Sequence, residues 1–293
     1  MAIKLSPIDV VDEISREEFL NNYLKPRKAL VIRNYARNWP AFKKWTFEYL
    51  QEVVGDKTVP IYNSSKADPS KPLNTATTEM KFADYIDLIR REPTDLRIFF
   101  FDPIKHASKL LEDYVAPKEL TGGFLDKFPG MFFGGEGSST FLHYDIDLAH
   151  IFHTHFHGRK HIILFDNKWK ERLYCLPFAT YALEDFDISN PDFEKFPALN
   201  GIEGYETVLE HGDTLFMPTG MWHWMKYLDG SFSISLRAWD SSWAVKARSL
   251  YNLTIQRKFD DIMKQNFSKR YMGWKEELAI KRAQNALLKS EPV

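Results

Sequence analysis

Two histidines and one aspartate stand at spacings that could place them around a single metal ion. In Thr140-Phe-Leu-His143-Tyr-Asp145 the histidine and the aspartate are two positions apart, so on an extended strand both side chains point to one face, about 7 Å apart. A third ligand is available at His223, which follows an apolar stretch and a Pro-Thr-Gly turn. Two imidazoles and one carboxylate on one face, with other positions open, are the ligands of non-haem iron(II) oxygenases. The sequence therefore predicts an Fe(II) site at His143, Asp145 and His223.

The same residues also have a simpler interpretation. His-x-Asp occurs often by chance, and His223 could be a core histidine bonded to a carbonyl group. A cation at the head of an apolar strand favours the functional interpretation, because Lys160 directly precedes His-Ile-Ile-Leu-Phe165. A buried lysine needs an anionic partner, and a dicarboxylate cosubstrate is one. The alternative is that the Lys160 ammonium reaches solvent at the mouth of the strand.

Four further histidines, His150, His153, His155 and His157, lie in one short stretch. The last three alternate along the chain, so on a strand they would share a face. They could form a second metal site, or they could line the pocket and bond neighbouring groups. We favour the second interpretation.

The elements that position these residues have the pattern of a β-rich core. From about residue 130, short apolar stretches alternate with Gly, Pro and Asp without intervening helices, which favours a sandwich or barrel. The first 125 residues mix helix and strand signals, and apolar residues after Ser241 recur at helical spacing, which predicts two amphipathic helices. We expect an α/β segment over residues 1–125, a β core over 126–240 and a helical segment over 241–293.

Composition narrows the class of protein. The 293 residues include 39 Lys and Arg against 40 Asp and Glu, so no overall basic field exists to hold a polyanion and we expect no nucleic-acid partner. The single cysteine, Cys175, excludes an intramolecular disulfide framework and a cysteine-based zinc cluster. No apolar run reaches the ~18 residues of a membrane helix, and the first residues do not have the pattern of a signal peptide. We therefore expect a cytoplasmic protein without a membrane partner.

The order of the motifs resembles a known family. Its members share T-x-x-H-Y-D (residues 140–145), Gly-Arg-Lys before an apolar strand (158–160), G-D-x-L-F-x-P (212–218) and Trp-His (222–223). This order is similar to JmjC-type 2-oxoglutarate oxygenases. The stretches 190–197 (NPDFEKFP) and 204–207 (GYET) make the likeness greatest to the factor-inhibiting-HIF asparaginyl hydroxylase and bacterial cupin-like relatives.

This resemblance implies a mainly β fold with α elements. Its core would be a double-stranded β-helix, or jelly-roll, of the cupin and JmjC type, with N-terminal α/β elements and C-terminal helices. It also implies Fe(II) held by His143, Asp145 and His223, and 2-oxoglutarate anchored by Lys160 and Thr140. Because the resembling hydroxylase dimerises through its C-terminal helices, we further expect a homodimer formed by that segment.

Two positions depart from the family pattern. The strand-like stretch 98–101 (IFFF) lacks the tyrosine with which the family binds 2-oxoglutarate, and Arg237 stands where the family has an asparagine. Related oxygenases outside the JmjC branch use an arginine some dozen residues after the distal histidine for the far carboxylate. Arg237 shares the face of Ser233 and Ser235 on an extended strand, so it could bind 2-oxoglutarate with its planar fork. It could equally neutralise the aspartate beside the metal.

The sequence thus predicts an Fe(II)- and 2-oxoglutarate-dependent oxygenase, a hydroxylase of an aliphatic C–H bond that releases succinate and CO2. Its substrate would be a protein side chain or a small molecule, which fold and ligand set do not encode. One alternative is a metal-dependent cupin enzyme that uses no keto acid. Another is a binding module in which the same scaffold is catalytically silent.

Overall fold

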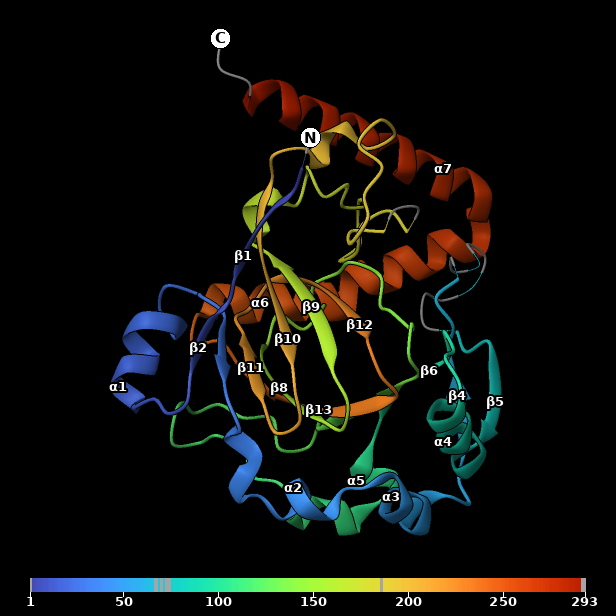
Figure 1. Cartoon of the computed structure of the whole chain (residues 1–293). Coiled ribbons are helices and arrows are strands. Elements are labelled where there is room, and N and C mark those ends of the chain that lie inside the picture. Colours follow the sequence, from blue (N-terminus) through green and yellow to red (C-terminus); the bar gives the residue numbers. More distant parts are fainter. Residues whose placement is uncertain (1, 66–67, 69–70, 72–74, 185–186, 291–293) are drawn as a thin grey trace.

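The centre of the molecule is a pair of facing β-sheets (Figure 1). The computed structural model describes residues 2–65, 68, 71, 75–184 and 187–290. One sheet has four strands in the order β1 (Lys4–Pro7), β10 (Glu203–Leu209), β9 (Lys160–Phe165) and β12 (Trp222–Tyr227). The other has seven, in the order β2 (Asp9–Val11), β3 (Leu30–Ile32), β11 (Thr214–Met217), β8 (His150–Phe156), β13 (Ser231–Ala238), β7 (Gly130–Gly134) and β6 (Arg97–Phe101).

Helices cover the two ends and the outer faces of this core. A small hairpin of β4 (Thr58–Ile61) and β5 (Thr78–Lys81) stands at one side (Figure 1). The N-terminal helices are α1 (Arg16–Phe19), α2 (Pro40–Lys44), α3 (Phe47–Val54), α4 (Phe82–Arg91) and α5 (Pro103–His106). The C-terminal part consists of α6 (Trp243–Tyr251), a π-helical turn η6 (Asn252–Gln256) and α7 (Arg257–Ser290). The backbone of α7 is non-helical at Ser268, where the chain turns and runs back over the top of the molecule (Figure 1).

Strict alternation along the strands divides the side chains between the inside and the outside of the jelly-roll. On β12, Trp222 and Trp224 pack outward, whereas Met225 packs inward between the two sheets. On β13, Phe232 and Ile234 likewise belong to an outer cluster, so the residues between them face inward. One part of the interior is apolar, with residues from both sheets: Ile151, Ile162, Leu164, Leu209, Leu215, Met217, Met221 and Met225. The polar part of the interior is where the site lies.

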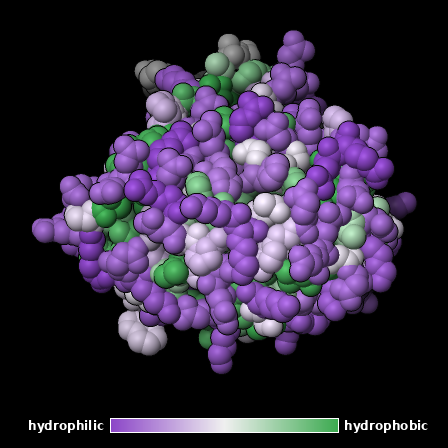
Figure 2. Space-filling view, turned by 60° about the horizontal axis from the view of Figure 1, so that its bottom comes forward, coloured by the Kyte–Doolittle hydropathy of each residue, from purple (hydrophilic) through white to green (hydrophobic). Residues whose placement is uncertain are grey.

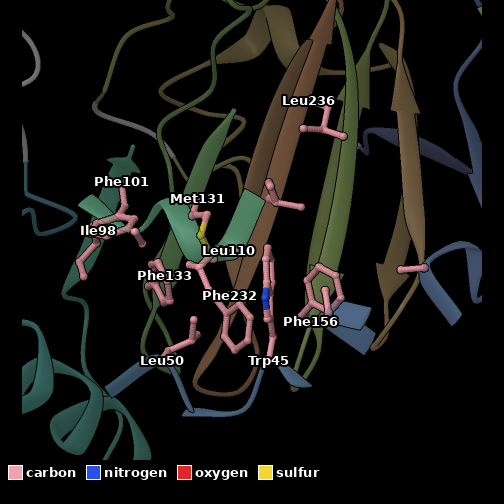
Figure 3. Packing of buried hydrophobic residues seen from close by; sticks show 14 of the residues in the cluster. Trp45, Leu50, Ile98, Phe101, Leu110, Met131, Phe133, Phe156, Phe232 and Leu236 are labelled. Carbon is pink, nitrogen blue, oxygen red and sulfur yellow. The ribbon is translucent and has the colours of Figure 1, made fainter. Parts of the chain in front are cut away.

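An aromatic cluster fastens the N-terminal helices to the outer face of the seven-stranded sheet. Trp45 and Phe156 have ring centroids 5.1 Å apart, and Phe156 stacks on Phe232 at 6.0 Å. Phe232 also stacks on Phe133, and Figure 3 shows these rings together beneath the strands. The face over α2, α3 and α5, by contrast, is mostly hydrophilic, with apolar side chains scattered rather than gathered (Figure 2).

The predicted fold class is confirmed: a jelly-roll core with N-terminal α/β elements and C-terminal helices. The three-part division at residues 125 and 240 stays a prediction. N-terminal strands β2, β3 and β6 are members of the same sheet as β8 and β13, so the first segment completes the core rather than standing apart. Among the residues that the structure describes, no helix has both the length and the apolar character needed to cross a membrane.

Truncating the aromatic cluster should cost much of the stability of the fold. Phe232 is fully buried, so Phe232→Ala should lower the free energy of unfolding by about 3–5 kcal/mol, through lost burial and the cavity left behind. Urea unfolding followed by tryptophan fluorescence measures this loss. Val208→Ala, at a half-exposed position of β10, is the matched control and should stay within about 0.5 kcal/mol of wild type. Equal losses in both variants would contradict this account of the core.

Candidate active site

The two predicted histidines meet through their backbones. His223 lies on β12, and His143 lies in the segment between β7 and β8, outside the named strands. The His143 amide donates to the His223 carbonyl at 3.2 Å, and the His223 amide donates to the His143 carbonyl at 2.7 Å. Two residues that exchange both backbone hydrogen bonds lie directly opposite each other. Their rings are therefore neighbours, with centroids 4.2 Å apart.

Asp145 completes this group. Its Oδ1 lies 3.7 Å from Nε2 of His143 and 3.8 Å from Nε2 of His223. One ligand atom from each of the three residues lies within 4.8 Å of the others. No other group of three or more potential ligands meets this condition among the described residues. The sequence had predicted this combination of residues, although it placed His143 and Asp145 on a regular strand, which the structure does not.

The tautomers of both imidazoles suit a metal. The Nδ1 of His143 lies 2.8 Å from the carbonyl of Phe141, and the Nδ1 of His223 lies 3.2 Å from that of Met221. A carbonyl only accepts, so each Nδ1 carries the hydrogen and each Nε2 presents a lone pair toward Asp145. Burial, together with the neighbouring His223, lowers the pKa of His143 to about 3, which keeps that ring neutral at physiological pH. Two such imidazoles and one carboxylate fit the ligand preferences of iron(II), with further positions left open.

Arg237 holds the aspartate of this group. Its Nη2 lies 3.2 Å from Oδ2 of Asp145, and its Nε lies 3.1 Å from Oδ2 of Asp147. Burial raises the pKa of Asp145, but Arg237 and the two histidines outweigh it and the net shift is downward. Asp145 therefore stays ionised, with Oδ1 toward the histidines and Oδ2 toward the guanidinium. Arg237 thus contacts two carboxylates in the structure, and its role toward 2-oxoglutarate stays a prediction.

Lys160 is buried inside the jelly-roll, where it is 1% exposed. Its Nζ donates to Oγ of Ser233 at 2.6 Å and lies 3.2 Å from Nε2 of His153. It also lies 4.1 Å from the centre of the Tyr227 ring. Among the residues described, no carboxylate pairs with this ammonium, and burial lowers the pKa of Lys160 well below its ordinary value. The lysine does not reach solvent at the strand mouth, so the simpler interpretation of Lys160 is wrong.

The histidines of β8, and His157 just after it, lie in different surroundings. His153 bonds Ser235 at 2.8 Å and His155 bonds Ser233 at 2.9 Å, so both face the interior beside Lys160. His150 faces the other side, with Nε2 3.5 Å from Asp240. His157 lies beyond the strand in a left-handed conformation and packs on Phe47. The prediction that His153, His155 and His157 share one face is therefore correct only for the first two.

A cleft of about 490 Å³ opens beside the metal ligands. His143, Asp145 and Thr140 line it together with residues of α7 and of the segment around Tyr181. Thr140 pairs with Met225 through both its amide, at 2.9 Å, and its Oγ1, which accepts at 3.1 Å. Its hydroxyl hydrogen is therefore free to donate to a ligand.

Sequence reasoning missed two members of the site. Tyr227 lies four residues after His223 on β12, so period-2 alternation predicts that both face inward. Asp147 repeats the spacing of His143 and Asp145, and it shares Arg237 with Asp145. Either signal could have been found in the sequence. What could not be found there is the pairing of Tyr227 with Lys160 across the β9–β12 ladder.

Comparisons with known proteins agree with this geometry. A family model described as a cupin-like domain matches residues 15–242. Lysine-specific demethylase 8 of Danio rerio is 31% identical over 248 residues, which cover 79% of this chain and 59% of that protein. Its counterpart in Xenopus tropicalis is 30% identical, covering 75% of this chain and 50% of the relative. The tRNA wybutosine-synthesizing protein 5 of Homo sapiens is 28% identical, with 76% and 75% covered.

The chain thus spans about half the length of the demethylases that it matches. The matched part nevertheless includes His143, Asp145 and His223 with Lys160 and Arg237, whereas the α7 residues that line the cleft lie outside it. The prediction of Fe(II) and 2-oxoglutarate as cofactors is confirmed at the level of the family, since the His-Asp-His group stands within the matched domain. The chain belongs to the cupin-like domain family and is a relative of the JmjC-domain oxygenases.

Proposed function

We propose that this protein is an Fe(II)- and 2-oxoglutarate-dependent oxygenase that hydroxylates an aliphatic C–H bond of a protein side chain or a small molecule. The observation that carries the proposal is the combination of two features within one jelly-roll. His143, Asp145 and His223 present a complete ligand set, and Lys160 presents a buried cation without a carboxylate partner among the described residues. A metal site alone would not need the second feature.

When bound, Fe(II) would supply the activation of dioxygen, which oxidises 2-oxoglutarate to succinate and CO2 and leaves one oxygen atom on the substrate carbon. The contribution of the chain is to bind and to orient. His143 and His223 would ligate through Nε2, and Arg237 would fix the rotamer of Asp145 so that Oδ1 is the ligating oxygen. Second-shell contacts of this kind commonly determine how a ligand is oriented.

Lys160 would neutralise the far carboxylate of 2-oxoglutarate. It pairs with Tyr227 across the β9–β12 ladder, and His223 lies four residues before Tyr227 on β12, which is roughly 13 Å of strand. A lysine side chain and a five-carbon diacid lying end to end can bridge this separation. Thr140, which lines the cleft between these levels, would donate its hydroxyl hydrogen to the same cosubstrate.

The two alternatives predict different requirements. A cupin enzyme without a keto acid would keep the metal ligands but would not need Lys160 to be buried beside Ser233 and His153. A silent binding module would not need the arrangement of tautomers at His143 and His223. The structure retains both features, which supports the oxygenase.

The class of substrate, a protein side chain or a small molecule, is also part of the proposal. Names of relatives refer to lysine demethylation and to tRNA wybutosine synthesis, so protein and tRNA substrates both occur among relatives. For this chain, the absence of a nucleic-acid partner and a cytoplasmic location stay predictions. The near-neutral overall charge supports the first.

We also propose that the C-terminal segment forms a homodimer. On α6, η6 and the first half of α7, Trp243 is 82% exposed, Leu250 62%, Ile255 59% and Ile262 56%. Apolar side chains recurring along helices in this way indicate a face that is covered by a partner. A second copy is the occupant that the resemblance to a C-terminally dimerised hydroxylase supports.

Removing the anionic metal ligand should abolish turnover. Asp145→Ala should yield no succinate from 2-oxoglutarate and should weaken Fe(II) binding sharply, because two neutral imidazoles remain. Succinate is measured by NMR and iron by anaerobic calorimetry. Asp56→Ala, on the exposed surface, is the control and should behave as wild type. Succinate formation by the Asp145 variant at the wild-type rate would exclude this site.

Two substitutions should separate the roles of the two cations. Lys160→Met should raise the apparent constant for 2-oxoglutarate at least about a hundredfold, because a lost buried ion-pair partner costs about 3–5 kcal/mol. Iron binding should be intact. Arg237→Met should affect 2-oxoglutarate less and turnover more, because its contacts are to Asp145 and Asp147. Titration of both variants with 2-oxoglutarate under anaerobic Fe(II) measures the difference, and a reversed order would reverse the assignments.

A charge placed on the exposed helical face should separate the dimer. Ile262→Asp should give a monomer by light scattering at concentrations where wild type is dimeric, since burying an unpaired carboxylate is costly. Gln265→Asp adds the same charge at an exposed polar position of α7 and should remain dimeric. A monomeric wild type at micromolar concentration would contradict the proposal.

A further inference from the structure

The wall of the cleft formed by α7 contains buried charges that the proposed reaction does not use. Asp260 is 7% exposed, Lys264 4% and Lys275 0%. With the tyrosines Tyr181 and Tyr271 they form one bonded group, here called the α7 charge cluster. Asp260, Lys264 and Tyr181 also line the cleft beside His143 and Asp145.

Asp260 is the centre of the α7 charge cluster. Its Oδ1 accepts from Nζ of Lys275 at 2.6 Å and from the hydroxyl of Tyr271 at 3.0 Å. Its Oδ2 lies 2.9 Å from Nζ of Lys264. Lys264 also donates to the hydroxyl oxygen of Tyr181 at 3.0 Å. Both oxygens of the one carboxylate are therefore engaged.

The charges of the α7 charge cluster do not balance. One carboxylate faces two ammonium groups, and burial raises the pKa of Tyr181 to about 12, so the tyrosine supplies no negative charge at neutral pH. Burial lowers the pKa of Lys264, but Tyr181 and Asp260 outweigh it and the net shift is upward, so Lys264 stays charged. An ammonium has three donors, and Asp260 and Tyr181 take two of those of Lys264. No partner is shown for the third among the described residues, and Lys264 lines the cleft.

Tyr181 connects this cluster to the metal ligands. Its backbone forms a β-bridge with His143, so the two residues lie side by side on neighbouring segments. The amide of Tyr144, next to His143, donates to the carbonyl of Thr180 at 2.9 Å and extends this pairing. Lys264 is thus connected to His143 through Tyr181, whose hydroxyl accepts from Lys264 and whose backbone pairs with His143. A ligand of ordinary small-molecule size could contact both, because the cleft holds about 490 Å³.

Most other charges of the cleft have their own partners or the opposite sign, and Arg257, which also lines the cleft, is exposed to solvent. Lys71 pairs with Asp68 at 3.9 Å, and Arg97 donates to the carbonyl oxygens of Asn63 and Ser139. Glu184 and Asp261 are acidic and would repel an anion. Within the described lining, Lys264 is the buried lysine, and an anionic group is best accommodated there because water and salt screen the exposed Arg257.

We propose that Lys264 anchors an anionic group, a carboxylate or a phosphate, of the substrate that is oxidised at the metal centre. That the anion belongs to a substrate rests on the proposed oxygenase function. The existence of the anion site does not depend on that function. The proposal restricts the substrate to a molecule or side chain whose acid group and oxidised carbon both fit within the cleft. Asp260, Lys275 and Tyr181 are the positioning residues that hold the ammonium in place.

Direct binding of two simple anions tests the site without turnover. Inorganic phosphate and acetate are titrated separately into the metal-free protein by calorimetry, with chloride used to hold ionic strength constant. Wild type should bind at least one of them, and Lys264→Met should bind it at least about tenfold more weakly, because a charge-assisted hydrogen bond in a buried place is lost. Binding of phosphate alone would identify a phosphorylated substrate, and binding of acetate a carboxylate.

Three further variants make the result specific. Lys258→Met removes an exposed lysine from the same helix and should bind as wild type. Lys264→Met made in the Lys160→Met background should show the same loss relative to Lys160→Met alone, which separates this site from the proposed 2-oxoglutarate site. Lys264→Arg should recover part of the binding. Asp260 keeps Lys275 and Tyr271 in Lys264→Met, so the variant should stay folded, and circular dichroism checks this.

Two outcomes would overturn the proposal. One is equal binding of the anion by wild type and Lys264→Met. The other is no binding of either anion by wild type. Because neither iron nor oxygen enters the experiment, a failure here is distinct from a failure to form succinate.

Discussion

The pair of backbone hydrogen bonds between His143 and His223 is the interaction on which the site depends. His143 belongs to no named strand, and this bridge is what attaches it to β12. Because backbone pairing fixes both Cα positions, the side chains need only choose rotamers, and the carbonyls of Phe141 and Met221 fix those as well. A ligand set assembled from residues 80 positions apart thus acquires the rigidity of a strand pair.

The polar half of the jelly-roll interior is a second constraint. Lys160, His153, His155, Ser233 and Ser235 form one bonded group in a place where most jelly-roll positions are apolar. Burying an ammonium among neutral donors and acceptors is costly, so burial lowers the pKa of Lys160, and a partner of opposite charge would stabilise the charged form. Nε2 of His155 is likewise buried without a hydrogen-bond partner in the structure. Such groups are unfavourable for stability alone, which is why they indicate a ligand.

Sequence reasoning succeeded where one strand or one motif carried the information. Alternation on β13 correctly put Ser233, Ser235 and Arg237 on one face, and the spacing of the metal ligands needed no fold to be recognised. It did not reach interactions created by a turn of the chain. Lys275 lies 15 residues after Asp260, and the turn at Ser268 brings them together. The prediction of two helices implies a break between them, but it does not say which side chains the turn brings into contact.

The division of α7 into two halves joins distant parts of the molecule. The half before Ser268 supplies a wall of the cleft, while the half after it packs Ala279 and Ala283 on the cluster that covers the outer face of the four-stranded sheet. The alanines at these two positions allow the helix to approach that face closely. The packing of Ala279 and Ala283 therefore helps to position the same helix whose first half lines the cleft. In this molecule, contacts on the outer face of the four-stranded sheet thus contribute to the shape of the cleft.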